Sequence, residues 1–304
     1  MSMPQHIICL GKSTLDRIWP LPSLPTTGGK YRATGYLELG GGMAATAAVA
    51  VARLGAKASF CGCAGDDAAG QAMRSELTRY GVDVTQFRLF PDARSSVSAV
   101  IVSGDGERMI VNFSGENIPQ CASWLEVGNV ATAGAVLADV RWAEGASTMY
   151  AAAQAHGIPT VLDGEAAHAD TFAMLLPLVD HAIFSLPGLR SFSGDRIVDH
   201  AESLQNIREL GCRIAAVTLG AQGALWLDER GLHHQPAFAT KVVDTTGAGD
   251  VFHGAYALAL AEGMDVPTAM RFSSGVAALK CSHYGGRAGI PERAEVEQFL
   301  SRMP

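Results

Sequence analysis

Short apolar stretches alternate with helix-like stretches along most of this chain, and this alternation constrains its fold more than any other feature. The stretches typical of strands are 6–10, 57–61, 134–140, 159–162, 182–184 and 214–219, and those typical of helices are 44–54, 69–80 and 149–156. Such alternation predicts a mostly parallel sheet with helices on both faces. In sheets of this kind, ligands bind beyond the carboxyl ends of the strands.

Two segments break the alternation and predict a small second sheet. Residues 30–39 are extended in character, and residues 96–103 and 107–113 flank Asp105-Gly106, a dipeptide typical of a hairpin turn. Together they predict a small antiparallel sheet that stands off the main body as a lid, over about residues 13–39 and 96–115. We expect one α/β domain over residues 1–304 that carries this lid.

Composition excludes several classes of partner. The net charge of −7 argues against non-specific nucleic-acid binding, which needs a basic face. No stretch reaches the roughly 18 apolar residues of a membrane span, and the apolar run 7–10 is too short for a signal peptide. The six cysteines lack disulfide or zinc spacing, which is typical of free thiols in a reducing cytoplasm. We therefore expect a cytoplasmic protein with no membrane and no nucleic-acid partner.

The run 244–254 carries the strongest chemical signal. It reads Asp-Thr-Thr-Gly-Ala-Gly-Asp-Val-Phe-His-Gly, between the β-like pair Val242-Val243 and a helical stretch from Val251 to about residue 261. A glycine-rich turn that opens a helix presents free N–H groups, and the helix dipole favours an anion there. The carboxylate of Asp250 would repel a phosphate, so we expect it to act there as a proton acceptor. An anion site beside a base indicates phosphoryl transfer to an alcohol.

The chain resembles the ribokinase or PfkB-type carbohydrate kinases over nearly its whole length. The matching motifs are Gly40-Gly41-Gly42 before the Ala-rich stretch, Gly65-Asp66-Asp67 with Gly70, Val217-Thr218-Leu219-Gly220 with Gly223, and the run 244–254. The resemblance implies a ribokinase-like α/β fold, a three-layer sandwich with a mostly parallel central sheet and a small β-sheet lid. It also implies an ATP- and Mg²⁺-dependent sugar kinase that forms a homodimer through the lid.

Carried over position by position, the resemblance implies a role for each matching residue. The residues are Asp250, Gly247, Ala248 and Gly249 for catalysis; Asp16, Gly41 and Gly42 for substrate hydroxyls; and Thr218, Gly220 and Gly223 for the nucleotide. Asp250 would act as the general base, and the amides of the turn would stabilise charge on the transferring phosphoryl group. A P-loop kinase is not indicated, because the sequence has no Gly-x-x-x-x-Gly-Lys-Ser/Thr string.

Two positions depart from the family pattern. Thr46 stands where members often carry Asn, and the segment 185–188 replaces an Asn-x-x-Glu motif. The sequence therefore does not identify the Mg²⁺ ligands, and Asp163-Gly164-Glu165 is a candidate replacement for the missing carboxylate. The altered motif also leaves open a non-catalytic sugar-binding protein on the same fold, whereas the intact Asp250 favours an enzyme.

Three residues are candidates for binding an anionic end of the substrate, although each alone also suits an ordinary surface or strand-end position. Arg141 directly follows a predicted strand, Lys30 begins the first lid segment, and Asn112 lies near the end of the hairpin. Arginine binds tetrahedral oxyanions through its planar fork, and lysine adds a compact charge. Within the family, the strings 29–31, 137–142 and 285–291 resemble bacterial 6-deoxy-6-sulfofructose kinases, which share the departures at positions 46 and 185.

By this resemblance Lys30, Asn112 and Arg141 hold the sulfonate, and the C1 hydroxyl of the sugar faces Asp250. Arg287 is a further expected anion contact, near the nucleotide. Residue types alone do not separate a sulfonate from a phosphate ester. Fructose 6-phosphate and unmodified fructose therefore remain alternative substrates of the same reaction class.

Overall fold

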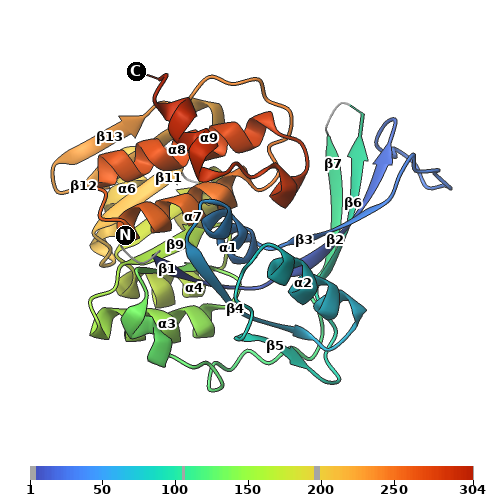
Figure 1. Cartoon of the computed structure of the whole chain (residues 1–304), viewed down its shortest axis with the longest axis horizontal. Coiled ribbons are helices and arrows are strands. Elements are labelled where there is room, and N and C mark those ends of the chain that lie inside the picture. The colour runs from blue at the N-terminus through green and yellow to red at the C-terminus, as the bar shows by residue number, and fades with distance from the viewer. Residues whose placement is uncertain (1–4, 105–106, 195–198, 304) are drawn as a thin grey trace.

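A nine-stranded sheet forms the centre of the computed structural model, which describes residues 5–104, 107–194 and 199–303 (Figure 1). Its strand order is β13-β12-β11-β10-β9-β8-β1-β4-β5. The strands are β1 (His6–Leu10), β4 (Lys57–Gly65), β5 (Phe87–Phe90), β8 (Ala135–Asp139), β9 (Thr160–Gly164), β10 (His181–Ser185), β11 (Ile214–Thr218), β12 (Ala224–Asp228) and β13 (Gly231–Gln235). Neighbouring strands from β5 to β11 pair in parallel, and β12 and β13 add an antiparallel edge. The predicted mostly parallel sheet is confirmed.

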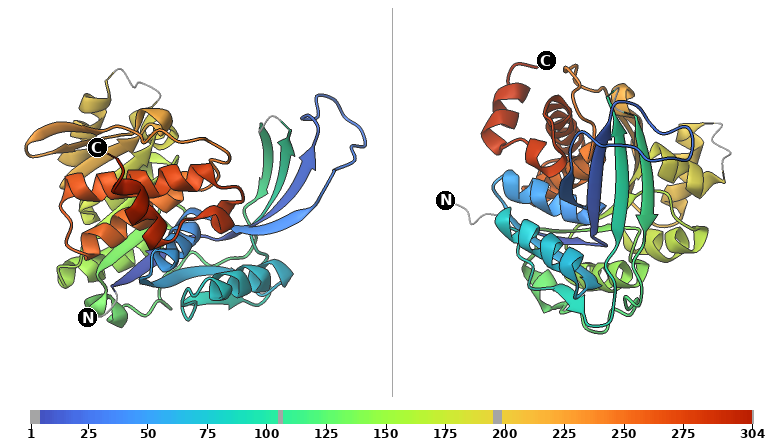
Figure 2. Two further views of the ribbon diagram at one scale, coloured as in Figure 1. Left: turned by 45° about the horizontal axis from the view of Figure 1, so that its top comes forward. Right: turned by 90° about the vertical axis from the view of Figure 1, so that its right-hand side faces the viewer.

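Helices cover both faces of this sheet, as the alternation in the sequence predicts (Figures 1 and 2). In β1, Ile7 and Cys9 belong to one buried apolar cluster and Ile8 and Leu10 to a second, because successive side chains of a strand point to opposite faces. The first cluster includes side chains of α1 (Met43–Arg53), α2 (Ala68–Arg79), α7 (Ala248–Ala261), α8 (Val266–Ser282) and α9 (Arg293–Leu300). The second includes side chains of α3 (Ala143–Ala155), α4 (Ala169–Leu175), α5 (Leu186–Ser193) and α6 (His200–Glu209).

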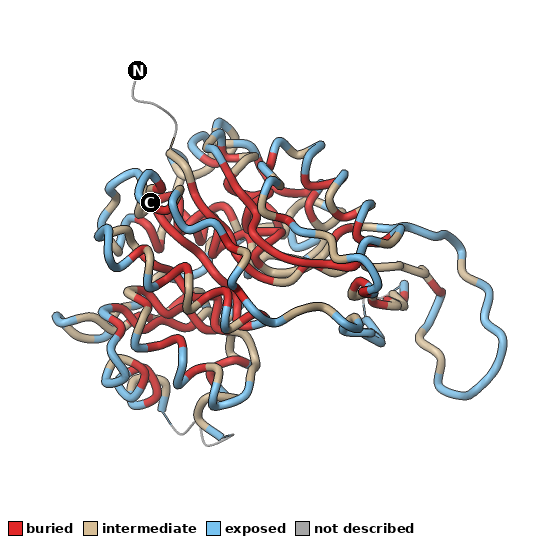
Figure 3. Tube along the Cα trace, turned by 90° about the horizontal axis from the view of Figure 1, so that it is seen from below, coloured by how far each residue is buried: buried red, intermediate tan, exposed pale blue. Residues whose placement is uncertain are grey.

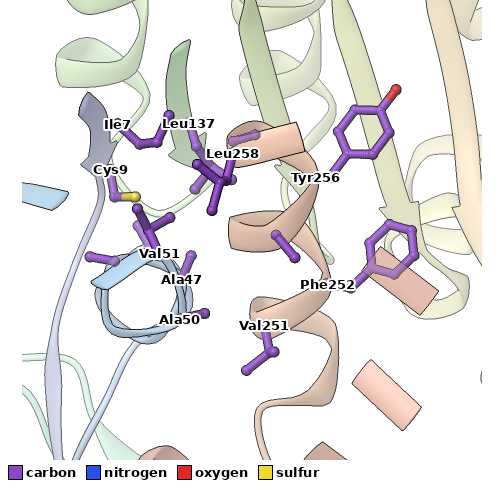
Figure 4. Close-up of a cluster of buried hydrophobic side chains, with 14 of the residues drawn as sticks. Ile7, Cys9, Ala47, Ala50, Val51, Leu137, Val251, Phe252, Tyr256 and Leu258 are labelled. Atoms are coloured by element: carbon purple, nitrogen blue, oxygen red, sulfur yellow. The ribbon is translucent and has the colours of Figure 1, made fainter. Parts of the chain in front are cut away.

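Helices α1 and α7 pack closely, and their contact places the glycine-rich run of the sequence. Figure 4 shows Ala47 and Ala50 on the side of α1 that faces α7. At Gly254 of α7, an added Cβ atom would lie 2.5 Å from the carbonyl oxygen of Ala47, so only glycine permits this approach. The small side chains of α1 therefore set the position of α7, and with it the turn at the start of α7.

The lid is a separate four-stranded sheet that projects from the main body (Figures 1 and 2). Its strand order is β3-β2-β6-β7, with the bounds β2 (Thr14–Leu21), β3 (Leu37–Gly41), β6 (Val97–Ser103) and β7 (Arg108–Phe113). The predicted hairpin of β6 and β7 is confirmed, and its Asp105-Gly106 turn lies outside the described residues. The central pair, β2 and β6, is parallel, so the sheet is mixed where antiparallel pairing was expected. Parallel pairing is possible because a long crossover through the main body joins these two strands.

Two further expectations from the sequence are tested by the fold. Val242 and Val243 do not form a strand; they are 62% and 50% exposed in the connection after β13, because the sheet already ends at that edge strand. All six cysteines are free thiols, as predicted. Within the described ranges, no helix is both long and apolar enough to cross a membrane.

The deepest burial follows the strands of the large sheet, whereas the loop between β2 and β3 is mostly exposed along its length (Figure 3). This loop, which carries Lys30, extends from the lid away from the large sheet (Figure 1).

Candidate active site

The glycine-rich run forms a tight turn that opens α7. Gly247 caps the helix with a φ of 74°, the left-handed conformation that favours glycine. The amide of Ala248 donates to the carbonyl oxygen of Thr245 at 3.2 Å and so closes the turn. The Ala248 amide is therefore not free to bind an anion. Of the three residues expected to form the anion site, Gly247 and Gly249 keep available amides, since amides at the start of a helix have no acceptor within that helix.

Asp250 follows the turn and is half-buried in the first turn of α7. Burial raises the pKa of Asp250 to about 7, and the charge of Asp163 adds to the rise, whereas His253 and Arg287 oppose it. A general base works best when its pKa lies near the working pH. The position and the pKa of Asp250 are therefore those that proton abstraction beside an anion site requires.

Behind Asp250 lies a buried pair, Asp163 at the end of β9 and His253 on α7. The Oδ2 atom of Asp163 is 3.4 Å from Nδ1 of His253 and has no hydrogen-bond partner. The His253 ring also contacts two carbonyl oxygens, that of Gly249 at 2.8 Å and that of Ile183 at 3.1 Å. His253 thus ties the first turn of α7 to β10. No role for His253 was expected from the sequence, although it stands in the glycine-rich run.

One row of polar side chains crosses the lid. Asp16 of β2 is in register with Ser98 of β6, which is in register with Asn112 of β7, so the three side chains share a face. Asn112 Nδ2 donates to Ser98 Oγ at 3.1 Å. The side chain of Asp16 also lies close to Gly41 at the end of β3, because a Cβ atom at Gly41 would lie 2.4 Å from the Oδ2 atom of Asp16. The structure thus brings together Asp16, Gly41 and Asn112, all predicted substrate contacts.

Gly42 contributes to the same region through its backbone. Its φ of 99° is in the left-handed range, and a Cβ atom there would lie 2.4 Å from the carbonyl oxygen of Lys12. Gly42 caps α1, so it joins the end of β3 directly to the helix that packs on α7.

Arg287 is buried close to Gly41 and Thr46, and its expected contact with an anion near the nucleotide stays a prediction. Its guanidinium donates to the carbonyl oxygen of Gly41 at 2.9 Å and to Thr46 Oγ1 at 3.2 Å. It also pairs with Glu76 at 3.4 Å, and Glu76 accepts the Gly40 amide at 2.5 Å. Arg287 therefore holds the end of β3 at Gly41 and, through Glu76, at Gly40. Thr46, one of the departures from the family pattern, is a partner of this arginine.

The three residues proposed for an anionic sugar lie on separate elements. Arg141 follows β8, where its amide donates to Asp139 at 2.8 Å and its guanidinium to the carbonyl of Ala166 at 2.9 Å. Asn112 lies on the lid, and Lys30 is exposed on the projecting loop. In the described part of the chain, no hydrogen bond or ion pair joins any two of the three.

The predicted nucleotide residues follow β11. Thr218 ends this strand in register with Ser185 of β10. Gly220 and Gly223 have φ values of 57° and 88°, and a Cβ atom at Gly223 would lie 2.0 Å from the carbonyl oxygen of Gln235. Ser185, the other departure from the family pattern, caps α5 by accepting the Gly188 amide at 3.0 Å. The altered motif thus begins beside the predicted nucleotide site and keeps a capping function.

The carboxylates of Asp163 and Glu165, at the carboxyl end of β9, suit a metal ion that binds together with a nucleotide. Among the described residues, no group of three or more His, Cys, Asp or Glu side chains could hold a metal ion. Asp163 nevertheless has a buried oxygen without a partner, and Glu165, two residues on, is half-buried. Mg²⁺ is usually bound by one or two carboxylates together with substrate phosphates and water. Such a donor set suits Mg²⁺ bound to ATP.

Comparison with known proteins agrees with this geometry. The sequence pattern that defines pfkB family carbohydrate kinases matches residues 4–293. The ribokinase of Bacillus subtilis is 28% identical over 299 residues, which cover 98% of this chain and all of that protein. The aminoimidazole riboside kinase of Salmonella typhimurium is also 28% identical, over 94% of this chain and 96% of its own length.

Solved structures show the same fold. A protein of Agrobacterium tumefaciens, provisionally named a ribokinase, superposes with a TM-score of 0.92 at 36% identity and covers 98% of both chains. Arabidopsis thaliana ribokinase, solved with ribose and ATP, has a TM-score of 0.87 at 26% identity over 98% of this chain and 99% of that one. The ribokinase-like fold predicted from the sequence is confirmed.

Proposed function

The chain belongs to the pfkB family of carbohydrate kinases, and we propose that it transfers the γ-phosphoryl group of ATP to the C1 hydroxyl of 6-deoxy-6-sulfofructose. The product is 6-deoxy-6-sulfofructose 1-phosphate. The family and the named relatives are sugar or nucleoside kinases, and the sulfonated ketose is our proposal. The observation that carries phosphoryl transfer is the half-buried Asp250 directly after the glycine turn.

The chemistry follows from the order of groups along the turn. Asp250 accepts the proton of the attacking hydroxyl, which its raised pKa of about 7 permits near neutrality. The oxygen then bonds to the γ-phosphorus while the bond to the β-phosphate oxygen breaks and ADP leaves. The amides of Gly247 and Gly249 face the charge that spreads over the phosphoryl oxygens, as the helix dipole also favours.

ATP and Mg²⁺ are the cofactors of kinases in this family. We assign the nucleotide to the end of β11 and the loop after it, with Thr218, Gly220 and Gly223. Glu165, directly after β9, is the carboxylate that we assign to the side of the site where Mg²⁺ would bind. When bound, Mg²⁺ neutralises charge on the nucleotide phosphates.

The substrate proposal rests on the cationic end of the site. Arg141 lies at the carboxyl end of β8, the edge at which parallel sheets bind ligands. Its guanidinium is engaged only by a backbone carbonyl in the described residues, so it keeps donors for an anion. Asn112 shares a lid face with Asp16, and closure of the lid would carry both toward Arg141. Lys30 is the member that must move furthest, because its loop extends away from the large sheet.

An ADP-release assay with four sugars tests the proposal. We expect turnover to be fastest with 6-deoxy-6-sulfofructose, slower with fructose 6-phosphate, and slowest with the neutral sugars fructose and ribose. Ribose belongs in the panel because several relatives are named ribokinases. A preference for ribose would overturn the sulfonate assignment while keeping the kinase. ADP release with none of the sugars would favour a binding protein on this fold.

We also propose a homodimer through the lid. Strand β7 is exposed along its whole length, and Ile110 and Val111 are 58% and 66% exposed. An open strand edge with apolar side chains is commonly covered by another chain. Light scattering after gel filtration tests this: a dimer is expected for the native chain and a monomer for Val111→Lys, and a native monomer would refute it.

A further inference from the structure

A buried ammonium lies behind the glycine turn. Lys280 is in the last turn of α8, and its side chain is fully buried. Its Nζ atom is 3.0 Å from the carbonyl oxygen of Asp244 and 3.5 Å from the Asp244 Oδ2 atom. Burial lowers the pKa of Lys280, and Asp244 opposes this change. A charge taken out of water needs such partners, and the C-terminal end of a helix also favours a cation.

Asp244 is held from several sides. Its carboxylate accepts the amides of Gly285 at 2.9 Å, Gly286 at 3.2 Å and Thr246 at 2.9 Å. Burial alone would raise its pKa, but these hydrogen bonds and the charge of Lys280 bring the pKa of Asp244 well below its usual range. Asp244 therefore stays ionised, and an ionised carboxylate in this place needs a nearby cation.

The backbone completes the attachment. The carbonyl oxygen of Cys281, next to Lys280, accepts the amides of Val243 at 2.7 Å and Asp244 at 3.1 Å. Three residues later the chain reaches Gly247, whose turn is closed by the Thr245–Ala248 hydrogen bond. The segment that enters the turn is thus clamped to the end of α8, and Lys280 supplies the charge within the clamp.

We propose that Lys280 is a positioning residue whose ammonium acts as an internal monovalent cation. It neutralises Asp244 and so holds the phosphate-facing amides in place. Oxygen atoms of a carboxylate and a carbonyl would equally bind a small free cation, but Nζ already fills the place. Turnover then needs no added monovalent cation at this position. This inference rests on the proposed kinase function, because the turn is assumed to face the transferred phosphoryl group.

Removal of the side chain tests the inference by cation rescue. Lys280→Ala leaves a space beside the Asp244 oxygens, and Lys280→Met removes the charge with little change in volume. In choline chloride we expect both variants to lose about tenfold to a hundredfold in kcat, with the KM for the sugar little changed. Ammonium or K⁺ should restore part of kcat in Lys280→Ala and little in Lys280→Met, whose side chain still fills the space.

The wild type and a second lysine serve as controls. Wild-type kcat should change by less than about twofold when choline replaces K⁺ or ammonium, and Lys57→Ala, an exposed lysine at the start of β4, should behave alike. Thermal unfolding separates a folded variant from a collapsed one. The inference fails if Lys280→Met keeps wild-type kcat, or if Lys280→Ala is folded and no cation restores it.

ADP affinity gives a readout that does not depend on the sugar. By calorimetry, Lys280→Ala should bind ADP more tightly in ammonium chloride than in choline chloride, and the wild type equally in both. If the wild type turns over no sugar, the proposed function fails, and this affinity difference still decides the role of Lys280. Equal ADP affinity of Lys280→Ala in both salts would contradict it.

Discussion

Arg108 of the lid contacts Thr245, in the segment that enters the glycine turn: its Nη2 atom is 3.4 Å from Thr245 Oγ1. The same nitrogen is 3.9 Å from Asp244 Oδ1. The lid therefore touches the segment that enters the glycine turn, at Thr245 and at Asp244, the residue that Lys280 contacts. This contact joins the lid, where we propose that the sugar binds, to the turn proposed to face the phosphoryl group.

We expect Arg108→Ala to raise the KM for the sugar more than it lowers kcat. The contacts are long and partly exposed, and such pairs contribute about 0.2–1 kcal/mol, which is about 1.5- to 5-fold in KM. Steady-state kinetics with the preferred sugar measures this. Arg79→Ala, at an exposed position of α2, is the control and should leave KM unchanged. Equal effects of the two substitutions would mean that the lid contact contributes nothing to binding.

Asp250→Asn should abolish most turnover and leave the fold intact. An amide cannot take the proton, so kcat should fall at least about a hundredfold while ADP still binds. In the wild type, kcat should rise with pH through about 7, since Asp250 is protonated and inactive below its pKa. A pH series of initial rates checks both. Residual turnover well above about one hundredth would show that another group is the base.

The same substitution should change the pH dependence of stability. Asp250 keeps its proton up to about pH 7 in the native state, whereas the unfolded chain loses it near the ordinary value of 3.8. Native stability therefore falls as pH rises through this window, because the unfolded state binds fewer protons. The Tm of Asp250→Asn minus that of the wild type should grow from about pH 5 to about pH 8. A constant difference would contradict the raised pKa.

Local patterns explain how far the sequence predicted the fold. The strands of the large sheet are short apolar runs, and glycines 55 and 81 follow α1 and α2 with φ values of 87° and 78°. Each of these elements is thus predicted from residues that lie within it or next to it in the sequence. The parallel pairing of β2 with β6 depends on chain segments about 80 residues apart, and no local pattern encodes it. At Val242 and Val243 a local pattern was misleading. These two apolar residues are β-like in sequence, but they form no strand because no neighbouring strand pairs with them.

The candidate site divides in the same way. Asp250 and its turn stand in one continuous run, so the motif alone located them. Glu76 and Arg287 are 211 residues apart, and Lys280 and Asp244 are 36 apart, so neither pair has a sequence signature. A charged residue inside an apolar helical stretch, such as Lys280 in residues 276–281, is a signal from which a buried partner could have been predicted.

The buried pair of Arg287 and Glu76 should show strong energetic coupling. Arg287→Met leaves Glu76 buried without its cation, and breaking a buried pair typically costs about 3–5 kcal/mol of unfolding free energy. Glu76→Gln keeps an oxygen for the Gly40 amide. The double variant should therefore lose less stability than the sum of the two single changes. Urea unfolding of the four proteins measures this, and additive losses would show that the pair is not coupled.

Arg141 decides between an anionic and a neutral sugar. Its side chain lies at the carboxyl end of β8 with one backbone acceptor, so Arg141→Ala removes charge without removing a buried ion pair. Loss of a hydrogen bond to a charged group costs about 1.5–3 kcal/mol, so the KM for the sulfonated ketose should rise about 10- to 150-fold. The KM for fructose should change little, because fructose has no anionic group to lose. Arg141→Lys keeps the charge without the planar fork, so its KM for the sulfonated ketose should lie between those of the wild type and Arg141→Ala. Equal effects of Arg141→Ala on both sugars would place the anion elsewhere, and the sulfonate assignment would then be wrong.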